Sequence, residues 1–172
     1  IRVMKGLGKK QEAYRLYKQS TDQKVLTYKA AREMVNLLSE RWLGEAGEML
    51  DFAREQLSSH GGLPGMFAIV LDAYIERDIE TDEKKFFKKT DISQALNQAE
   101  IEAAESDPSN YLGQSMRYSA LNTMALVHIE RGEKKKAKAV FEQILNHYDP
   151  HPWKYRHSDP KELFMEYAMR FA

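Results

Sequence analysis

The sequence predicts an all-α chain, because helix-breaking residues separate long runs of helix formers and because one spacing recurs. Gly and Pro number 9 and 5 in 172 residues, and the segments between them are rich in Ala, Leu, Glu, Lys, Gln and Met. The recurring spacing is 42 positions, which separates Ala95 from Ala137 and Pro108 from Pro150. A small residue and a breaker that return together indicate that one helical hairpin has been copied and stacked.

In the first half of the chain, apolar residues at helical spacing predict four helices, at about 9–20, 25–42, 46–57 and 66–77. Thr21-Asp22 is expected to cap the second of these helices, and Gly44 is expected to end it. The glycine-rich run 60–65 predicts the clearest loop. The fourth helix is apolar on more than one face, so we expect it to lie between neighbouring helices.

In the second half, the same pattern predicts helices at about 91–103, 111–131, 134–148 and 160–171. Asp107-Pro108 is expected to close the first of them, and Gly132 to separate the second from the third. Asp159-Pro160 combines an N-cap with a proline at the first helical position, so it predicts the start of the last helix.

The stretch 79–89 interrupts this pattern, and we interpret it as an insertion that Phe86-Phe87 anchors against the body. Asp91 and Gln94 follow it at the spacing of a capping box, which predicts where the next helix begins.

Composition excludes several classes of partner and site. Lys plus Arg and Asp plus Glu both number 26, so no net charge attracts nucleic acid or an anionic membrane. Cysteine is absent, which excludes disulfides, thiolate metal sites and a cysteine nucleophile, and favours the cytoplasm. The longest apolar stretch, 66–74, is too short to cross a bilayer. We expect residues 1–172 to form a single domain that is part of a longer chain, since the sequence opens at Ile1 without a start methionine.

The best-preserved block of the hairpin pattern consists of Leu121, Met124, Ala125, His128, Gly132, Ala137, Phe141, Ile144 and Pro150. At these spacings it resembles a divergent tetratricopeptide repeat. Ala125 and Ala137 are small where two antiparallel helices would cross, and Gly132 would end the first of them. A partial echo at the start of the chain repeats the intervals of five and four positions, at Gly8, Ala13 and Tyr17.

The resemblance implies antiparallel helical hairpins stacked in a right-handed superhelix, whose concave groove holds a peptide or helix of a partner protein. Carried over to the best repeat, the partner-binding positions are Ser119, Asn122, Leu126 and Ile129. The basic residues with which some family members clamp a terminal carboxylate are absent from this repeat. We therefore predict a non-enzymatic scaffold that binds a protein or peptide without cofactor or metal ion, and we leave self-association open.

Two alternatives come from other classes. The first is a regulatory domain of a longer signalling or transcription protein, in which a peptide or small ligand changes the curvature of the superhelix. The second is a metal-dependent enzyme that would use His147, His151 and His157. Because Pro150 and Pro152 break any helix between the first two histidines, we prefer to interpret this stretch as an aromatic-rich connector.

Two substitutions express the preferred hypothesis. Leu126→Asp should weaken partner binding and leave the domain folded, whereas Ala137→Phe should unfold it by overpacking the helix crossing.

Overall fold

A computed structural model describes residues 1–23, 27–81, 86–105, 111–144 and 146–171, and this part of the chain is helical with no strand. Its α-helices are α1 (Arg2–Gly6), α2 (Lys10–Asp22), α3 (Tyr28–Leu37), α4 (Glu48–His60), α5 (Ile69–Thr81), α6 (Thr90–Glu105), α7 (Tyr111–Arg131), α8 (Lys134–Ile144), α9 (Pro150–Trp153) and α10 (Pro160–Phe171). Two 3₁₀ turns, η1 (Met66–Ala68) and η2 (Phe86–Lys88), precede α5 and α6. None of these helices has the length and apolarity that crossing a membrane requires.

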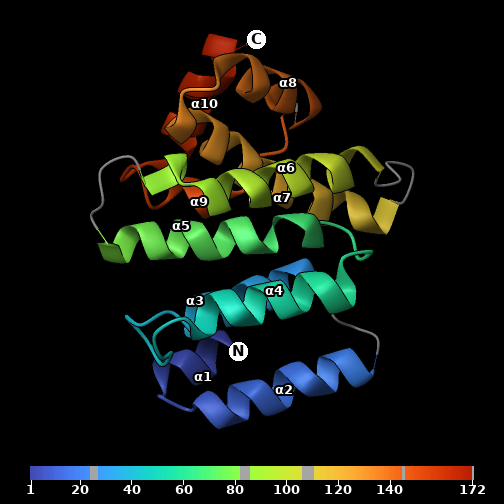
Figure 1. The fold of residues 1–172 in the computed structure, drawn as a ribbon, viewed down its shortest axis with the longest axis vertical. Coiled ribbons are helices and arrows are strands. Elements are labelled where there is room, and N and C mark those ends of the chain that lie inside the picture. The colour runs from blue at the N-terminus through green and yellow to red at the C-terminus, as the bar shows by residue number, and fades with distance from the viewer. Residues whose placement is uncertain (24–26, 82–85, 106–110, 145, 172) are drawn as a thin grey trace.

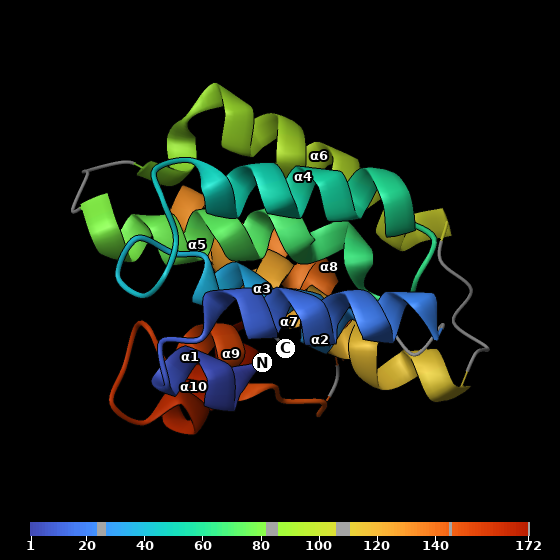
Figure 2. The same cartoon turned by 90° about the horizontal axis from the view of Figure 1, so that it is seen from below.

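The helices are stacked along the long axis of the molecule, from α1 and α2 at one end to α8 and α10 at the other (Figure 1). Neighbours in sequence pack together, for example α4 on α5 and α7 on α8. In addition, α1 contacts α3, α3 contacts α5, α5 contacts α7, and α7 contacts α9. Seen from below, α4 and α6 lie on one side of the stack and α1, α9 and α10 on the other (Figure 2). The odd-numbered helices α1, α3, α5 and α7 therefore form a continuous row, and α9 packs against α7.

The middle of the stack is α5 with the preceding turn η1, where every residue from 65 to 76 is buried. This confirms the prediction that the helix lies between neighbours. The buried run includes two carboxylates, Asp72 and Glu76, both 0% exposed. Ionised groups in such positions need partners, because desolvation of an unpaired charge is costly.

Helix boundaries near the N-terminus differ from the prediction. Thr21-Asp22 lies inside α2, and the cap of α3 is Thr27, whose Oγ1 accepts a hydrogen bond from the Ala30 amide at 3.2 Å. The helix α1 is not predicted from the sequence, because a helix of five residues carries too little periodicity to detect.

Gly44 serves a purpose other than the predicted helix stop. The helix α3 ends at Leu37, and the chain then turns back over that end, where the Leu43 amide donates to the Leu37 carbonyl at 3.1 Å. A Cβ atom at Gly44 would lie 1.8 Å from the Leu38 carbonyl oxygen. Glycine is therefore required by the close approach of two backbone segments.

The insertion and the following helix are partly as predicted, since residues 79–81 of the predicted insertion belong to α5 and residues 82–85 lie outside the described part of the chain. Phe86 and Phe87 are buried, 3% and 4% exposed. The proposed capping box is wrong, because Asp91 lies inside α6 and its Oδ2 accepts a hydrogen bond from the Tyr74 hydroxyl at 2.9 Å. The predicted stop at Asp107-Pro108 lies outside the described residues.

The best-preserved repeat corresponds to α7 and α8. Gly132 has a φ of +76°, and its amide donates to the Ile129 carbonyl at 2.9 Å, while the Glu133 amide donates to the His128 carbonyl at 2.9 Å. These two bonds form a Schellman cap, which needs glycine at the left-handed position. Gly132 therefore ends α7 as predicted.

The C-terminal elements depart from the prediction at one point. The helix α8 ends at Ile144, before the predicted end at 148, and the short α9 follows. The start of α10 is confirmed, since Asp159 Oδ1 accepts hydrogen bonds at 3.0 Å from the amides of Lys161 and Glu162.

Ala137→Phe is expected to lower the free energy of unfolding by about 1–3 kcal/mol, because Ala137 is 0% exposed on α8, which packs against α7, and a larger side chain overpacks the interior. Urea unfolding measures the change. The matched control is Ala139→Phe, at an exposed position of the same helix, which should change stability by less than about 0.5 kcal/mol. Equal effects of the two substitutions would contradict the packing of α8 on α7.

Candidate functional site

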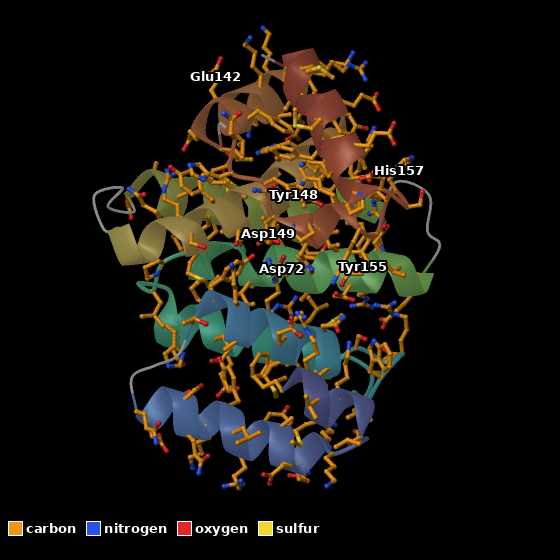
Figure 3. All side chains as sticks on the ribbon, turned by 180° about the vertical axis from the view of Figure 1, so that it is seen from behind. Asp72, Glu142, Tyr148, Asp149, Tyr155 and His157 are labelled. Atoms are coloured by element: carbon orange, nitrogen blue, oxygen red, sulfur yellow. The ribbon has the colours of Figure 1, made fainter. Side chains whose placement is uncertain are left out.

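Residues 147–156 lie against the row of odd-numbered helices, and we call them the covering segment. Eight polar side chains gather where this segment meets the row. We call them the inner polar cluster: Tyr28, Arg32, Asp72, Glu76, Thr123, Asp149, His151 and Tyr155. Asp72, Asp149 and Tyr155 lie in the middle of the molecule, whereas Glu142 and His157 lie at its periphery (Figure 3). The cluster thus joins α3, α5, α7 and the covering segment.

Asp72 is the centre of this cluster. Its Oδ2 accepts a hydrogen bond from the Tyr28 hydroxyl, and its Oδ1 accepts one from the Thr123 hydroxyl at 2.8 Å. His151 Nε2 lies 3.2 Å from the same Oδ1 and donates to it in the tautomer that carries the proton on Nε2. Since the donors come from α3, α7 and α9, one carboxylate links three elements to α5.

Glu76 lies one helical turn from Asp72 and is bound in a similar way. One oxygen pairs with the Arg41 guanidinium, and the other accepts a hydrogen bond from the Tyr155 hydroxyl. Burial, followed by the negative charge of Glu76, raises the pKa of Tyr155 above its ordinary value. Tyr155 therefore stays a neutral donor at physiological pH.

The third carboxylate, Asp149, joins the covering segment to α3. Its Oδ2 lies 3.3 Å from Arg32 Nη1, and its Oδ1 accepts from the His151 amide at 3.1 Å. Burial alone would raise the pKa of Asp149, but the Arg32 charge and hydrogen bonds from Ser119 and the His151 amide hold it below its usual range. Asp149 is therefore an ionised partner for Arg32.

The predicted partner-binding positions lie mostly in the interior. Ser119, Asn122 and Leu126 are 2%, 0% and 1% exposed, and Ile129 is half-buried. The expectation that all four face an open groove therefore does not hold, because Asn122 is covered by residues 147–153 and Leu126 belongs to the apolar core, whereas Ser119 lies in the wall of a surface cavity. A role of these residues in partner binding stays a prediction, and Leu126→Asp is no longer expected to spare the fold.

Asn122 shows what occupies this face. Its Nδ2 donates to the His147 carbonyl at 2.9 Å and to the Tyr118 carbonyl at 2.8 Å, and its Oδ1 accepts from Trp153 Nε1 at 2.8 Å. As one of the predicted partner-binding positions, Asn122 was expected to contact a bound partner. In the structure it fixes the register of the chain's own covering segment.

Beside the covering segment lie two adjoining cavities of about 600 and 260 Å³, which share Arg2, Arg32, Asp149 and Pro150 in their walls. We call them together the cationic cleft. Their charged walls comprise five cationic side chains and two carboxylates, namely Arg2, Lys5, Lys29, Arg32 and Lys154 with Glu33 and Asp149. The cleft is therefore a local excess of positive charge in a chain without net charge.

The cationic cleft is not predicted from the sequence, because its walls come from three distant parts of the chain, residues 2–36, 114–119 and 147–155. Arg32 and Asp149, which pair across it, are 117 positions apart. One local signal was available: Arg2 and Lys5, and again Lys29 and Arg32, have the three-residue spacing that places both members on one helix face.

The histidines of the metal hypothesis have separate partners. His147 stacks on Tyr118 with ring centroids 3.8 Å apart, His151 binds Asp72, and the exposed His157 interacts with the backbone of Asp159. Within the described ranges, no group of three or more His, Asp or Glu side chains is placed to hold a metal ion.

A second polar group surrounds His128, at the C-terminal end of α7. The imidazole is 0% exposed, with Nδ1 2.9 Å from Glu133 Oε2 and Nε2 3.2 Å from Glu100 Oε1. Burial lowers the pKa of His128 below its ordinary value and outweighs the two carboxylates, which raise it. The imidazole is therefore neutral in the folded state near pH 7.

This burial predicts a pH dependence of stability. Below the ordinary His pKa of 6.5, the unfolded chain takes up a proton at His128 before the folded chain does, so the free energy of unfolding falls as the pH is lowered. One proton contributes at most about 1.4 kcal/mol per pH unit. Urea unfolding should give a smaller difference between wild type and His128→Gln at about pH 5.5 than at pH 7.5. A difference independent of pH would show that His128 titrates alike in both states.

No protein-family model matches the chain, and no curated protein or solved structure is significantly similar to it.

Proposed function

We propose that the chain is a non-enzymatic binding module that holds a peptide segment of a partner protein in the cationic cleft. The main support for this proposal is the covering segment, which lies on the row of odd-numbered helices in the way that a bound peptide would. Asn122 binds the backbone of the segment, Arg32 pairs with its Asp149, and Glu76 accepts from its Tyr155. A face that holds one stretch of chain by backbone and side-chain contacts, next to open cavities, has the parts of a peptide site.

We further propose that the helices form a right-handed, tetratricopeptide-like superhelix with the odd-numbered row on its concave face. Three observations support this proposal. The odd-numbered helices contact one another in sequence, Gly132 caps α7 at the position that the repeat requires, and Ala125 and Ala137 are both 0% exposed on the packed helices α7 and α8. In such an arrangement a partner would meet residues of several odd-numbered helices at once.

Selection of peptides from a phage-displayed library of random dodecamers tests the proposed function. We expect enrichment on the full 172-residue chain over an unrelated helical protein. A photo-cross-linking amino acid at Ser115, an exposed residue in the wall of the larger cavity, should capture the enriched peptide. The same group at Glu142, which is exposed at the periphery, is the matched control and should not (Figure 3).

Absence of enriched sequences would contradict the proposed function. Equal cross-linking from positions 115 and 142 would contradict its placement in the cationic cleft.

The covering segment also favours a second candidate function, a ligand-sensing domain. The segment is held by contacts between charged groups, including Arg156 with Asp78 and Glu130, each at 2.6 Å, which a competing ligand can replace. If binding displaces the segment, amide hydrogen exchange of residues 147–156 should accelerate when an enriched peptide is added. Unchanged or slower exchange would favour the simple scaffold.

A further inference from the structure

The charges of the cationic cleft do not balance. Its two carboxylates are already occupied, since Glu33 accepts hydrogen bonds from Nε and Nη2 of Arg2, and Asp149 pairs with Arg32 at 3.3 Å. Three lysines in the walls, Lys5, Lys29 and Lys154, remain without such a partner. The cleft therefore keeps an excess of three positive charges.

The contacts of the three lysines do not compensate this charge. Lys5 donates to the neutral amide oxygen of Asn36 and lies 4.1 Å from the ring centroid of Trp42. Lys154 lies 4.6 Å from the ring centroid of Tyr155. In the described part of the chain, no carboxylate lies within ion-pair distance of Lys5, Lys29 or Lys154.

The partial burial of Lys5 and Lys154 also favours the binding of an anion. Desolvation lowers the pKa of Lys5 and of Lys154 below the ordinary lysine value, although neighbouring glutamates act against it. An anion that enters the cleft would restore the favourable environment of both ammonium groups, because a nearby opposite charge stabilises the ionised form.

We propose that the cationic cleft binds an acidic peptide segment, with at least two aspartate or glutamate side chains spaced along it. This inference rests on the proposed function and names the chemistry of its partner. Two acidic side chains are needed because Lys29 lines the larger cavity, whereas Lys5 and Lys154 line the smaller one. A peptide that follows the cleft past Arg2 and Arg32 presents a carboxylate to each.

The identity of the uncompensated cations favours carboxylates over phosphate groups. Bidentate recognition of a phosphate group uses the planar guanidinium of arginine, and in the cleft the guanidinium groups of Arg2 and Arg32 already bind carboxylates of the chain. The charge left over belongs to lysines on three separate elements, α1, α3 and the covering segment. Such dispersed point charges suit a segment whose acidic residues are also dispersed.

The test uses the dodecamers enriched from the phage library, whose fusion to the phage coat leaves no free C-terminal carboxylate. We expect the enriched sequences to carry a net negative charge. The best of them, synthesised with an amidated C-terminus, should bind at least about tenfold more weakly to Lys29→Glu and to Lys154→Glu than to wild type, since like charges then face each other. Raising NaCl from about 0.05 to 0.5 M should weaken binding to wild type.

Lys135→Glu is the matched control, because it makes the same charge change at an exposed position of α8 away from the cleft. It should change the affinity less than about twofold. Thermal unfolding followed by circular dichroism verifies that all three variants fold. Enriched peptides that are neutral or basic, or equal affinity of the cleft variants and the control, would overturn the acidic preference while peptide binding stands. Failure to enrich any peptide would overturn both proposals.

Discussion

Leu126→Asp is expected to lower the free energy of unfolding by more than about 4 kcal/mol, because it places a carboxylate in the apolar interior. Leu126 is 1% exposed and belongs to the apolar core, and its neighbours Ala125 and Val127 are both 0% exposed. The carboxylate would have to be protonated or hydrated by water that enters the core, and each of these changes lowers the free energy of unfolding. Urea unfolding at pH 7 measures the loss.

The control for this substitution is Leu126→Met, which keeps the volume and apolarity of the side chain and should cost less than about 1.5 kcal/mol. The comparison of the two variants also decides whether Leu126 of α7 faces an open groove or lies in the interior. If Leu126→Asp costs less than about 1 kcal/mol and abolishes peptide binding, the residue faces an open groove, as the sequence alone predicted. A large loss of stability places it in the interior.

Asp72→Leu is expected to cost about 3–5 kcal/mol, because it removes the acceptor of three buried donors at once. The hydroxyls of Tyr28 and Thr123 and the imidazole of His151 would each lose a hydrogen bond in a place that water does not reach. Since these donors belong to α3, α7 and α9, the loss should also loosen the covering segment. Urea unfolding measures the first effect, and amide exchange of residues 147–156 measures the second.

Two further variants calibrate this result. Tyr28→Phe removes one of the three donors and should cost about 1 kcal/mol. Asp51→Leu replaces an exposed aspartate of α4 and should change stability by less than about 0.5 kcal/mol. Buried polar groups can sometimes be replaced by apolar ones without loss. A stability of Asp72→Leu equal to that of wild type would therefore show that the inner polar cluster serves something other than stability.

The fold class and several elements could be predicted because they depend on local patterns. Apolar residues on more than one face of 66–77 predicted the buried central helix, and Gly132 and Asp159-Pro160 predicted boundaries that the structure confirms. Each of these signals lies within a single helix or at its end, where sequence neighbours are spatial neighbours. The same logic failed at Thr21-Asp22, because residues that favour caps also occur inside helices whose other face is well packed.

The candidate site could not be predicted, because it depends on contacts between distant parts of the chain. Nothing local indicates that Asp149 will meet Arg32, or that Tyr155 will reach Glu76. A partial signal existed in the spacing of Asp72 and Glu76, which places two carboxylates on one face of an otherwise apolar helix. Two acids buried one turn apart require partners, and asking where those partners lie would have directed attention to this face.

The covering segment, residues 147–156, affects any ligand that binds the same face of the row. A segment tethered to the site that it occupies acts at an effective concentration in the millimolar range for short connections. A separate ligand that uses the same contacts would have to displace the covering segment. Its apparent affinity would equal its intrinsic affinity multiplied by the fraction of molecules in which the segment has left the face. A ligand that settles next to the segment avoids this penalty, and can use the segment as one wall of its own binding site.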